Sequence, residues 1–350
     1  MAKRIKEKAL ELPKIQGVAV SAPSVEYTED CCKMYQGTAT NKLKTVSVTN
    51  NKPTIEDYSG NAVIETDGLK ILLEKYTTKK TGLRISTQKL IDYGIVKLTE
   101  VNNYKEKTVE KLTTGVCFPL KEYAKALGYD VTEKITETAD EKKKEKKRID
   151  RILEKVRNRV NEDLEVLYSM SLSWKEPKGG TKGKSQDYAD VRLLQAKSIQ
   201  RGVVYIQFTE MMTSYLANAY VMQYPKSLFK LDERNPVAYQ IGYKLALHNC
   251  IFNNVKKNTQ GIINVETLLN ASGEIKTIES INETDPGHWD RRIKEPLEKA
   301  LDYLKQKNIL EYWEYSNSKG VALTDEQAEI KNYDDFIKLY IHFDLKNKKK

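Results

Sequence analysis

Apolar residues recur at helical spacing in several stretches of the chain. Leu120, Tyr123, Ala124 and Leu127 form one stripe that ends at Gly128, a residue suited to the end of a helix. The small Ala124 at the centre of this stripe would let a second helix approach closely. The pattern is typical of the first helix of a helix-turn-helix, although short amphipathic helices that end in glycine are also common.

The longest helical pattern covers residues 140–163. Its apolar positions recur at intervals of three and four residues: Ile149, Ile152, Leu153, Val156, Val160 and Leu164. Between Lys142 and Arg159, basic residues outnumber acidic ones severalfold. The pattern predicts a long amphipathic helix whose charged side is either a solvated face or a surface that contacts a nucleic-acid backbone.

Alternating or β-branched runs predict strands after this helix. Glu165–Trp174, Ala189–Gln195 and Val203–Phe208 are expected to form a small antiparallel sheet. A glycine-rich basic hairpin tip joins the first two runs and carries Lys178, Lys182 and Lys184. Such a tip serves either as a wing against phosphate or as a solvated hairpin.

The second half of the chain repeats the helical pattern. Asn235-Pro236 precedes one helix that reaches Phe252, and Asn264 is placed to cap a second, Val265–Leu269. A third begins near Trp289, with its apolar side formed by Ile293, Leu297, Ala300, Leu301 and Leu304. An alternating strand, Ile309–Tyr315, follows at once. Helix, helix, helix, strand is the order of a winged-helix domain.

Two further regions carry weaker patterns. Residues 1–66 contain few large apolar side chains and predict a loosely packed, partly disordered extension with short strands such as Lys44–Thr49. From Gly68 onward, Leu69, Leu72, Leu73 and Tyr76 recur at helical spacing, and Ser86 opens a second short helix.

Composition favours a polyanionic partner. The 350 residues exceed the usual span of one core, which predicts two domains, and 59 Lys and Arg against 49 Asp and Glu leave a net charge of +10. The four cysteines show no disulfide or metal-ligand spacing, which indicates a reducing cytoplasm. Without a long apolar run or a secretory leader, we expect a cytoplasmic protein that does not contact membranes.

Residues for several kinds of catalysis are missing. His248, His288 and His342 lie far apart, whereas a nicking initiator needs neighbouring histidines to hold a metal ion. Lys178 stands where a phosphate loop before Gly183 would need glycine. We therefore expect no enzyme activity, no metal ion and no cofactor.

Residues 202–315 resemble the replication initiators of iteron-type plasmids. The resemblance rests on Gly202–Phe208, Tyr215-Leu216 and Phe229-Lys230-Leu231, and is closest over Ile263–Leu269 and Trp289–Leu301. Residues 67–200 fit only in the order of their elements, and the long basic helix departs from the family's pattern. The resemblance implies an α+β fold with tandem winged-helix domains and small antiparallel β wings.

This fold divides the chain into four parts: an extension over 1–66, a first winged helix over 67–200 with the basic helix 140–163, a second winged helix over 201–318, and a tail over 319–350. The resemblance implies sequence-specific binding to duplex DNA at repeated origin sites and recruitment of host replication proteins. It also allows a homodimer. A transcriptional regulator built on the same domains is the main alternative, and an interaction protein whose winged helices bind protein is a third.

The expected DNA contacts lie mainly on the third helix of the second domain. Arg291 and Arg292 stand in its first turn, where base contacts concentrate, and arginine offers the planar fork that reads guanine. Lys294 and Lys299, with Lys178, Lys182 and Lys184 of the hairpin tip, are expected to contact phosphates. Two arginines at a helix start are otherwise ordinary surface residues.

Overall fold

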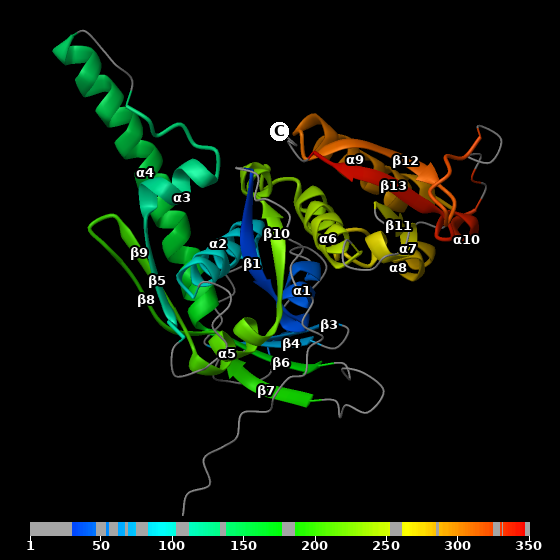
Figure 1. Cartoon of the computed structure of the whole chain (residues 1–350), viewed down its shortest axis with the longest axis horizontal. Coiled ribbons are helices and arrows are strands. Elements are labelled where there is room, and N and C mark those ends of the chain that lie inside the picture. Colours follow the sequence, from blue (N-terminus) through cyan, green and yellow to red (C-terminus); the bar gives the residue numbers. More distant parts are fainter. Residues whose placement is uncertain are drawn as a thin grey trace, which may run out of the picture.

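The computed structural model shows an α+β protein in which helices pack on small antiparallel sheets (Figure 1). The structure describes residues 30–46, 54–55, 62–66, 69–74, 83–102, 112–133, 138–176, 186–252, 261–284, 287–324, 330 and 332–346. The expectation of an α+β fold is confirmed.

Part of the first half follows the order helix, strand, helix, helix, strand, strand, if the two strands within residues 170–192, which belong to another sheet, are left out. These elements are α2 (Ile85–Val101), β5 (Gly115–Pro119), α3 (Leu120–Ala126), α4 (Ala139–Tyr168), β8 (Leu194–Gln200) and β9 (Val203–Phe208). The last strand lies in the middle, so the sheet order is β5-β9-β8. The predicted helices at Leu120 and over 140–163 are confirmed, and α4 continues to Tyr168.

The second half has the same order with two added helices. Its elements are α6 (Pro236–Phe252), β11 (Ile262–Asn264), α7 (Val265–Leu269), α8 (Ile278–Thr284), the π-turn η3 (Asp290–Lys294), α9 (Glu295–Gln306), β12 (Leu310–Ser316), α10 (Tyr333–Phe336) and β13 (Tyr340–Leu345). The sheet order is β11-β13-β12, again with the last strand in the middle. The three-stranded sheets of the two halves therefore share one strand order.

The predicted helices of the second half are confirmed. Asn264 caps α7, since its Oδ1 accepts a hydrogen bond from the backbone N–H of Thr267 at 3.3 Å. The helix α8 was not predicted. The prediction of a tail over 319–350 is wrong for Tyr340–Leu345, because β13 pairs with β11 on one side and β12 on the other.

The first half also contains a five-stranded sheet and a two-stranded ribbon. The sheet order is β2-β3-β4-β6-β7, from β2 (Thr54–Ile55), β3 (Ala62–Thr66), β4 (Leu69–Leu73), β6 (Met170–Glu176) and β7 (Gln186–Arg192). The ribbon pairs β1 (Cys31–Gln36) with β10 (Tyr220–Pro225), and α1 (Thr38–Thr45), α5 (Glu210–Asn218) and the 3₁₀ turn η2 (Lys226–Lys230) flank it.

Two predictions for this region are wrong. Leu69–Leu73 is a strand because Leu69, Ile71 and Leu73 alternate inward, and all three side chains are buried. Cys31–Thr45 is not a loose extension: Met34, Tyr35, Ala39 and Leu43 are fully buried in the core, and Lys44 and Thr45 lie in a helix rather than a strand.

The strands expected as one sheet belong to two. Glu165–Tyr168 is the last turn of α4, and β6 and β7 pair in the five-stranded sheet. The third predicted strand, β9, lies instead in the three-stranded sheet of the first half. The hairpin tip with Lys178, Lys182 and Lys184 falls outside the described residues.

Candidate nucleic-acid interface

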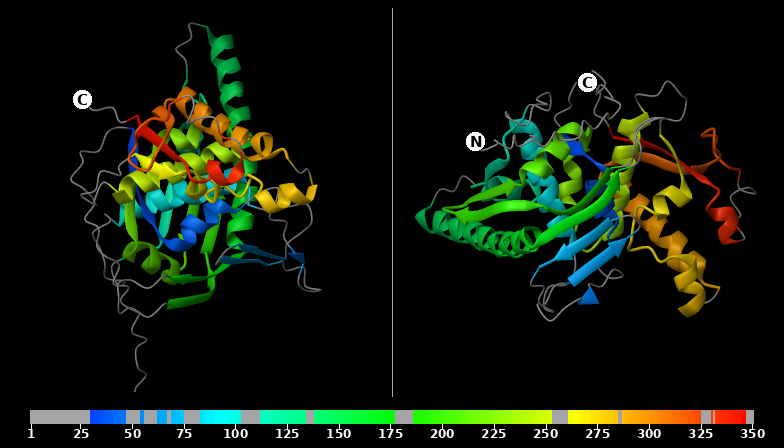
Figure 2. Two further views of the ribbon diagram at one scale, coloured as in Figure 1. Left: turned by 90° about the vertical axis from the view of Figure 1, so that its right-hand side faces the viewer. Right: turned by 90° about the horizontal axis from the view of Figure 1, so that it is seen from below.

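The long helix of the first half, α4, is held at its C-terminal part and extends from the body at its N-terminal part. Its capping box begins at Thr138, whose Oγ1 accepts from the Glu141 N–H at 3.3 Å. The buried side chains of Ile149, Val156, Val160 and Leu164 pack toward α2, α3 and β8. Figures 1 and 2 show the N-terminal end standing clear of neighbouring elements.

The exposed side of α4 is strongly basic. Lys147, Arg151 and Lys155 follow one another at a spacing of four residues, so they share one helix face. These three side chains form no ion pair with any residue that the structure describes. Arg148 and Arg159 differ, because Arg148 pairs with Glu145 at 2.8 Å and Arg159 pairs with Glu233 at 3.0 Å. The face of α4 thus offers uncompensated positive charge.

In the second half, α9 is the matching helix, since it also precedes the last two strands of a three-stranded sheet. Ile293, Leu297, Ala300, Leu301 and Leu304 are buried, as the sequence predicted. The helix begins with a widened turn in which the Glu295 N–H donates to the carbonyl of Asp290, five residues earlier. Pro296 follows and has no N–H to donate, which accounts for the irregular start.

The predicted DNA contacts on this helix fall into two groups. Arg291 and Arg292 are exposed in the widened turn, at the N-terminal end of the helix. Lys299 instead pairs with Glu295 at 2.7 Å, and Lys294 approaches Glu298 at 3.9 Å. Surface ion pairs of this kind are weak, so both lysines remain available to a stronger anionic partner.

A cleft of about 1010 Å³ lies between α4 and the end of α9; we call it the α4–α9 cleft. Arg151 and Lys155 of α4 line one side, and Tyr303 and Lys307 at the end of α9 line another. The segment Leu231–Arg234, which comes just before α6 in the chain, also lines the cleft. The basic face of α4 and the C-terminal end of α9 therefore border one recess.

Buried polar groups stiffen the wall of this cleft. Arg159 donates to Ser86 Oγ at 2.9 Å, and Asp163 Oδ1 accepts from Thr87 Oγ1 at 2.6 Å and from Ser86 Oγ at 3.1 Å. Burial raises the pKa of Asp163 to about 6. Burial also lowers the pKa of Lys89, which donates to the Leu231 carbonyl, to about 8.

The cleft residues were missed by the sequence reasoning. Lys230 and Arg234 lie on one segment and Lys307 on another, without a shared pattern, and only the fold gathers them beside α4. Arg291 and Arg292 do not line this cleft, because they lie at the opposite end of the α9 region from Lys307.

Three features of the described residues bear on a histidine site, a metal site and a membrane-spanning helix. His248 Nε2 lies 2.8 Å from the Ile262 carbonyl, as in a satisfied, half-buried histidine. Within the described ranges, no group of three or more His, Cys, Asp or Glu side chains could hold a metal ion. None of the helices that the structure describes has the length and apolar character needed to span a lipid bilayer.

Comparisons with known proteins add little. No family model and no curated protein matches the chain. One solved structure to which it is similar is the crystal structure of domains 2 and 3 of RctB, with 10% identity over 89% of this chain and all of that chain, at a TM-score of 0.40. A likeness at this score carries no argument about fold or function, which rest on the topology and side chains described above.

Proposed function

We propose that the chain binds duplex DNA through two winged-helix domains and initiates replication of a plasmid or mobile element at repeated origin sites, without catalysing a reaction itself. The observation that carries the proposal is the repeated topology. In each half a long helix, α4 or α9, precedes the last two strands of a three-stranded sheet, and the last strand is central. Exposed basic side chains lie on α4 and in the turn that begins α9. A helix in this position enters the major groove in winged-helix proteins.

The side chains support a division of labour between the two helices. Arg291 and Arg292 have the planar forks that read guanine edges, and they stand at the start of the helical segment, where base contacts concentrate. Lys147, Arg151 and Lys155 suit phosphates, because they form a long basic face with little geometric specificity. We assign base reading to the α9 region and backbone binding to α4, with Lys294 and Lys299 as further phosphate contacts.

The proposal is tested by binding of the purified full chain to the DNA that flanks its own gene, at two salt concentrations. We expect preference for that DNA over scrambled DNA, and at least about tenfold loss of preference on changing Arg291→Ala plus Arg292→Ala, since one arginine–guanine pair discriminates by about 1–3 kcal/mol. Lys42→Ala plus Lys70→Ala, at partly exposed positions on α1 and β4 beside the five-stranded sheet, is the charge control.

Equal and feeble binding of wild-type protein to all DNA would contradict the proposal and favour an interaction protein. A transcriptional regulator would show the same arginine dependence. The bound DNA separates the two: several direct repeats, each about two helical turns long, favour an initiator, and a lone inverted repeat favours a regulator.

A further inference from the structure

The first turns of α4, Ala139–Arg148, stand clear of the other elements; we call them the α4 arm (Figures 1 and 2). The arm is about 15 Å long at about 1.5 Å per residue. The capping box at Thr138 fixes its start, and at its other end Arg148 Nη1 donates to the Asp130 carbonyl at 2.8 Å. The arm is therefore a preformed helix, so binding a partner costs little ordering entropy.

Five lysines surround the arm on three sides. Successive residues of a helix are rotated by about 100°, which sorts the exposed cations of α4 into three rows. The rows are Lys142 with Lys146, then Lys143 with Lys147, then Lys144 with Arg151 and Lys155 farther along the helix. The first and third rows lie on opposite sides of the helix. All five lysines are exposed, and none forms an ion pair with a residue that the structure describes.

The first row lies where the helix would otherwise be apolar. Ile149, Val156 and Val160 are buried on the side of α4 that faces the body. Lys146 and Lys142 stand three and seven residues before Ile149, so they continue the same side of the helix. This side thus changes from apolar to cationic where the arm leaves the body. A partner of the arm can therefore be bound on both flanks.

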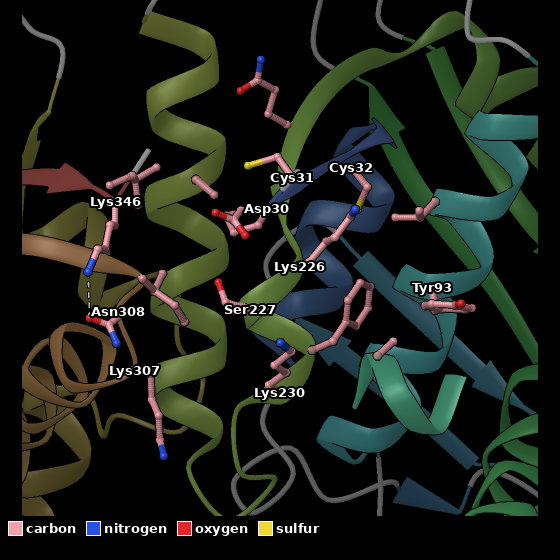
Figure 3. Close-up of a pocket in the computed structure, with 18 of the residues that line it drawn as sticks. Asp30, Cys31, Cys32, Tyr93, Lys226, Ser227, Lys230, Lys307, Asn308 and Lys346 are labelled. Atoms are coloured by element: carbon pink, nitrogen blue, oxygen red, sulfur yellow. Dashed lines mark hydrogen bonds between the residues drawn. The ribbon is translucent and has the colours of Figure 1, made fainter. Parts of the chain in front are cut away.

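A cleft at the junction of the two halves also has lysines in its lining, but the structure gives them partners. Figure 3 shows Lys346 hydrogen-bonded to Asn308, at 3.0 Å. Lys97, which also lines this cleft, lies 2.9 Å from Glu100 and 2.9 Å from Glu122. The lysines of the arm are freer than these two, so the arm is the better site for a polyanion.

Cations on three sides fit a groove and not a flat surface. An acidic protein face or a lipid surface touches one side of a helix, and insertion into lipid also needs a broad apolar side, which the arm lacks. The major groove of B-DNA is about 12 Å wide and admits a helix between two phosphate backbones. The major groove of double-stranded RNA is too deep and narrow for this.

We infer that the α4 arm lies in the major groove of duplex DNA and binds the phosphates of both strands. Lys142 and Lys146 contact one backbone, and Lys144 with Arg151 contacts the other. The inference rests on the proposed function, since it takes duplex DNA as the ligand, and it assigns groove binding to the part of α4 that leaves the body. Contacts to phosphates carry no sequence information, so the arm should act on any B-form duplex.

The experiment measures binding of the full chain to two duplexes, the DNA that flanks its own gene and a scrambled duplex of equal length, over a range of salt. The two test variants are Lys142→Ala plus Lys146→Ala and Lys144→Ala plus Arg151→Ala. On both duplexes, each variant should lower the slope of log K against log salt by about 1.8, because each lost phosphate contact contributes about 0.9. Lys42→Ala plus Lys70→Ala should leave the slope unchanged.

Ethylation interference on the gene-flanking duplex then assigns the contacts to strands. We expect the wild-type chain to show interference on both strands, on either side of one major groove. The Lys142 and Lys146 variant should lose it on one strand, and the Lys144 and Arg151 variant on the other. Alanine keeps helix propensity, and circular dichroism at 222 nm checks that the arm stays helical.

Three results would overturn the inference: an unchanged slope in either test variant, loss of interference on the same strand in both, or equally tight binding of the wild-type chain to double-stranded RNA. Equal binding to both DNA duplexes, with lower slopes in both variants, would reject sequence-specific initiation and leave the arm in the groove. Preference for the gene-flanking duplex, with one row of no effect, would reject the arm alone. No binding to either duplex would reject both.

Discussion

Asp163 is a buried carboxyl group in the wall of the α4–α9 cleft. Burial raises its pKa from 3.8 to about 6, and the hydroxyl groups of Thr87 and Ser86 partly offset that rise by donating to it. The folded chain therefore holds a proton at this site more tightly than the unfolded chain does. Between these two pKa values, raising the pH removes stability.

The Asp163→Asn variant tests this pH dependence. An amide oxygen can still accept from Thr87 and Ser86 but carries no titrating proton. We expect the unfolding free energy of the wild type, relative to the variant, to fall by about 2 kcal/mol between pH 4.5 and pH 7. Urea denaturation at both pH values measures it. A difference between the two proteins that does not change with pH would show that Asp163 titrates normally.

Single elements differ in how well the sequence predicts them. The helices α4, α6 and α9 were predicted because many apolar positions repeat at helical spacing over several turns. The short strand β4 was mistaken for a helix because Leu69, Leu72 and Leu73 fit helical spacing, while the buried alternation of Leu69, Ile71 and Leu73 fits a strand. The middle position of β13 depends on partners more than twenty residues away, which no local pattern contains.

The candidate site was only partly predictable for the same reason. Local helical spacing places Arg291 and Arg292 in the first turn of their predicted helix. The run of Lys and Arg residues over 142–159 shows in the same local way that α4 is basic. The cleft beside α4 requires Lys230 and Lys307, which meet only after the two halves pack. Sequence reasoning can thus name charged helix faces, but it cannot say which of them border a common recess.

The basic face of α4 should set the salt dependence of DNA binding. Replacing Lys147, Arg151 and Lys155 by alanine keeps helix propensity and removes three cations. We expect the slope of log K against log salt to decrease by about 0.9 for each phosphate that the variant no longer neutralises, with no change in preference between DNA sequences. Alanine at Lys33, Lys42 and Lys70 removes equal charge from β1, α1 and β4, outside both three-stranded sheets and their helices. An unchanged slope in the α4 variant would place this helix away from DNA.

At the scale of the whole molecule, a buried polar cluster joins the halves. Lys44 of α1 and Asp92 of α2 form an ion pair whose side chains are 2% and 0% exposed. Tyr239 of α6 donates to the same carboxylate, and its hydroxyl lies 3.1 Å from that of Tyr224. Burial raises the pKa of Asp92 and lowers that of Lys44. The cluster fixes α6, the first helix of the second half, against the first half.

Removing one member of this cluster should destabilise the fold. In Asp92→Ala the Lys44 ammonium stays buried without its partner, which costs about 3–5 kcal/mol. The double variant Lys44→Met plus Asp92→Leu should recover much of that loss, because no charge is then left buried. Chemical denaturation of the three proteins measures both effects. A single variant as stable as the wild type would show that the ion pair does not anchor the junction.

This junction matters because the proposed function requires both α4 and the α9 region to engage one duplex. Hydroxyl-radical footprinting of the full chain on a bound repeat tests that claim most directly. We predict two protected patches on the same duplex, one absent when Lys147, Arg151 and Lys155 become alanine and the other absent with Arg291→Ala plus Arg292→Ala. A single protected patch that survives either set of changes would contradict the account.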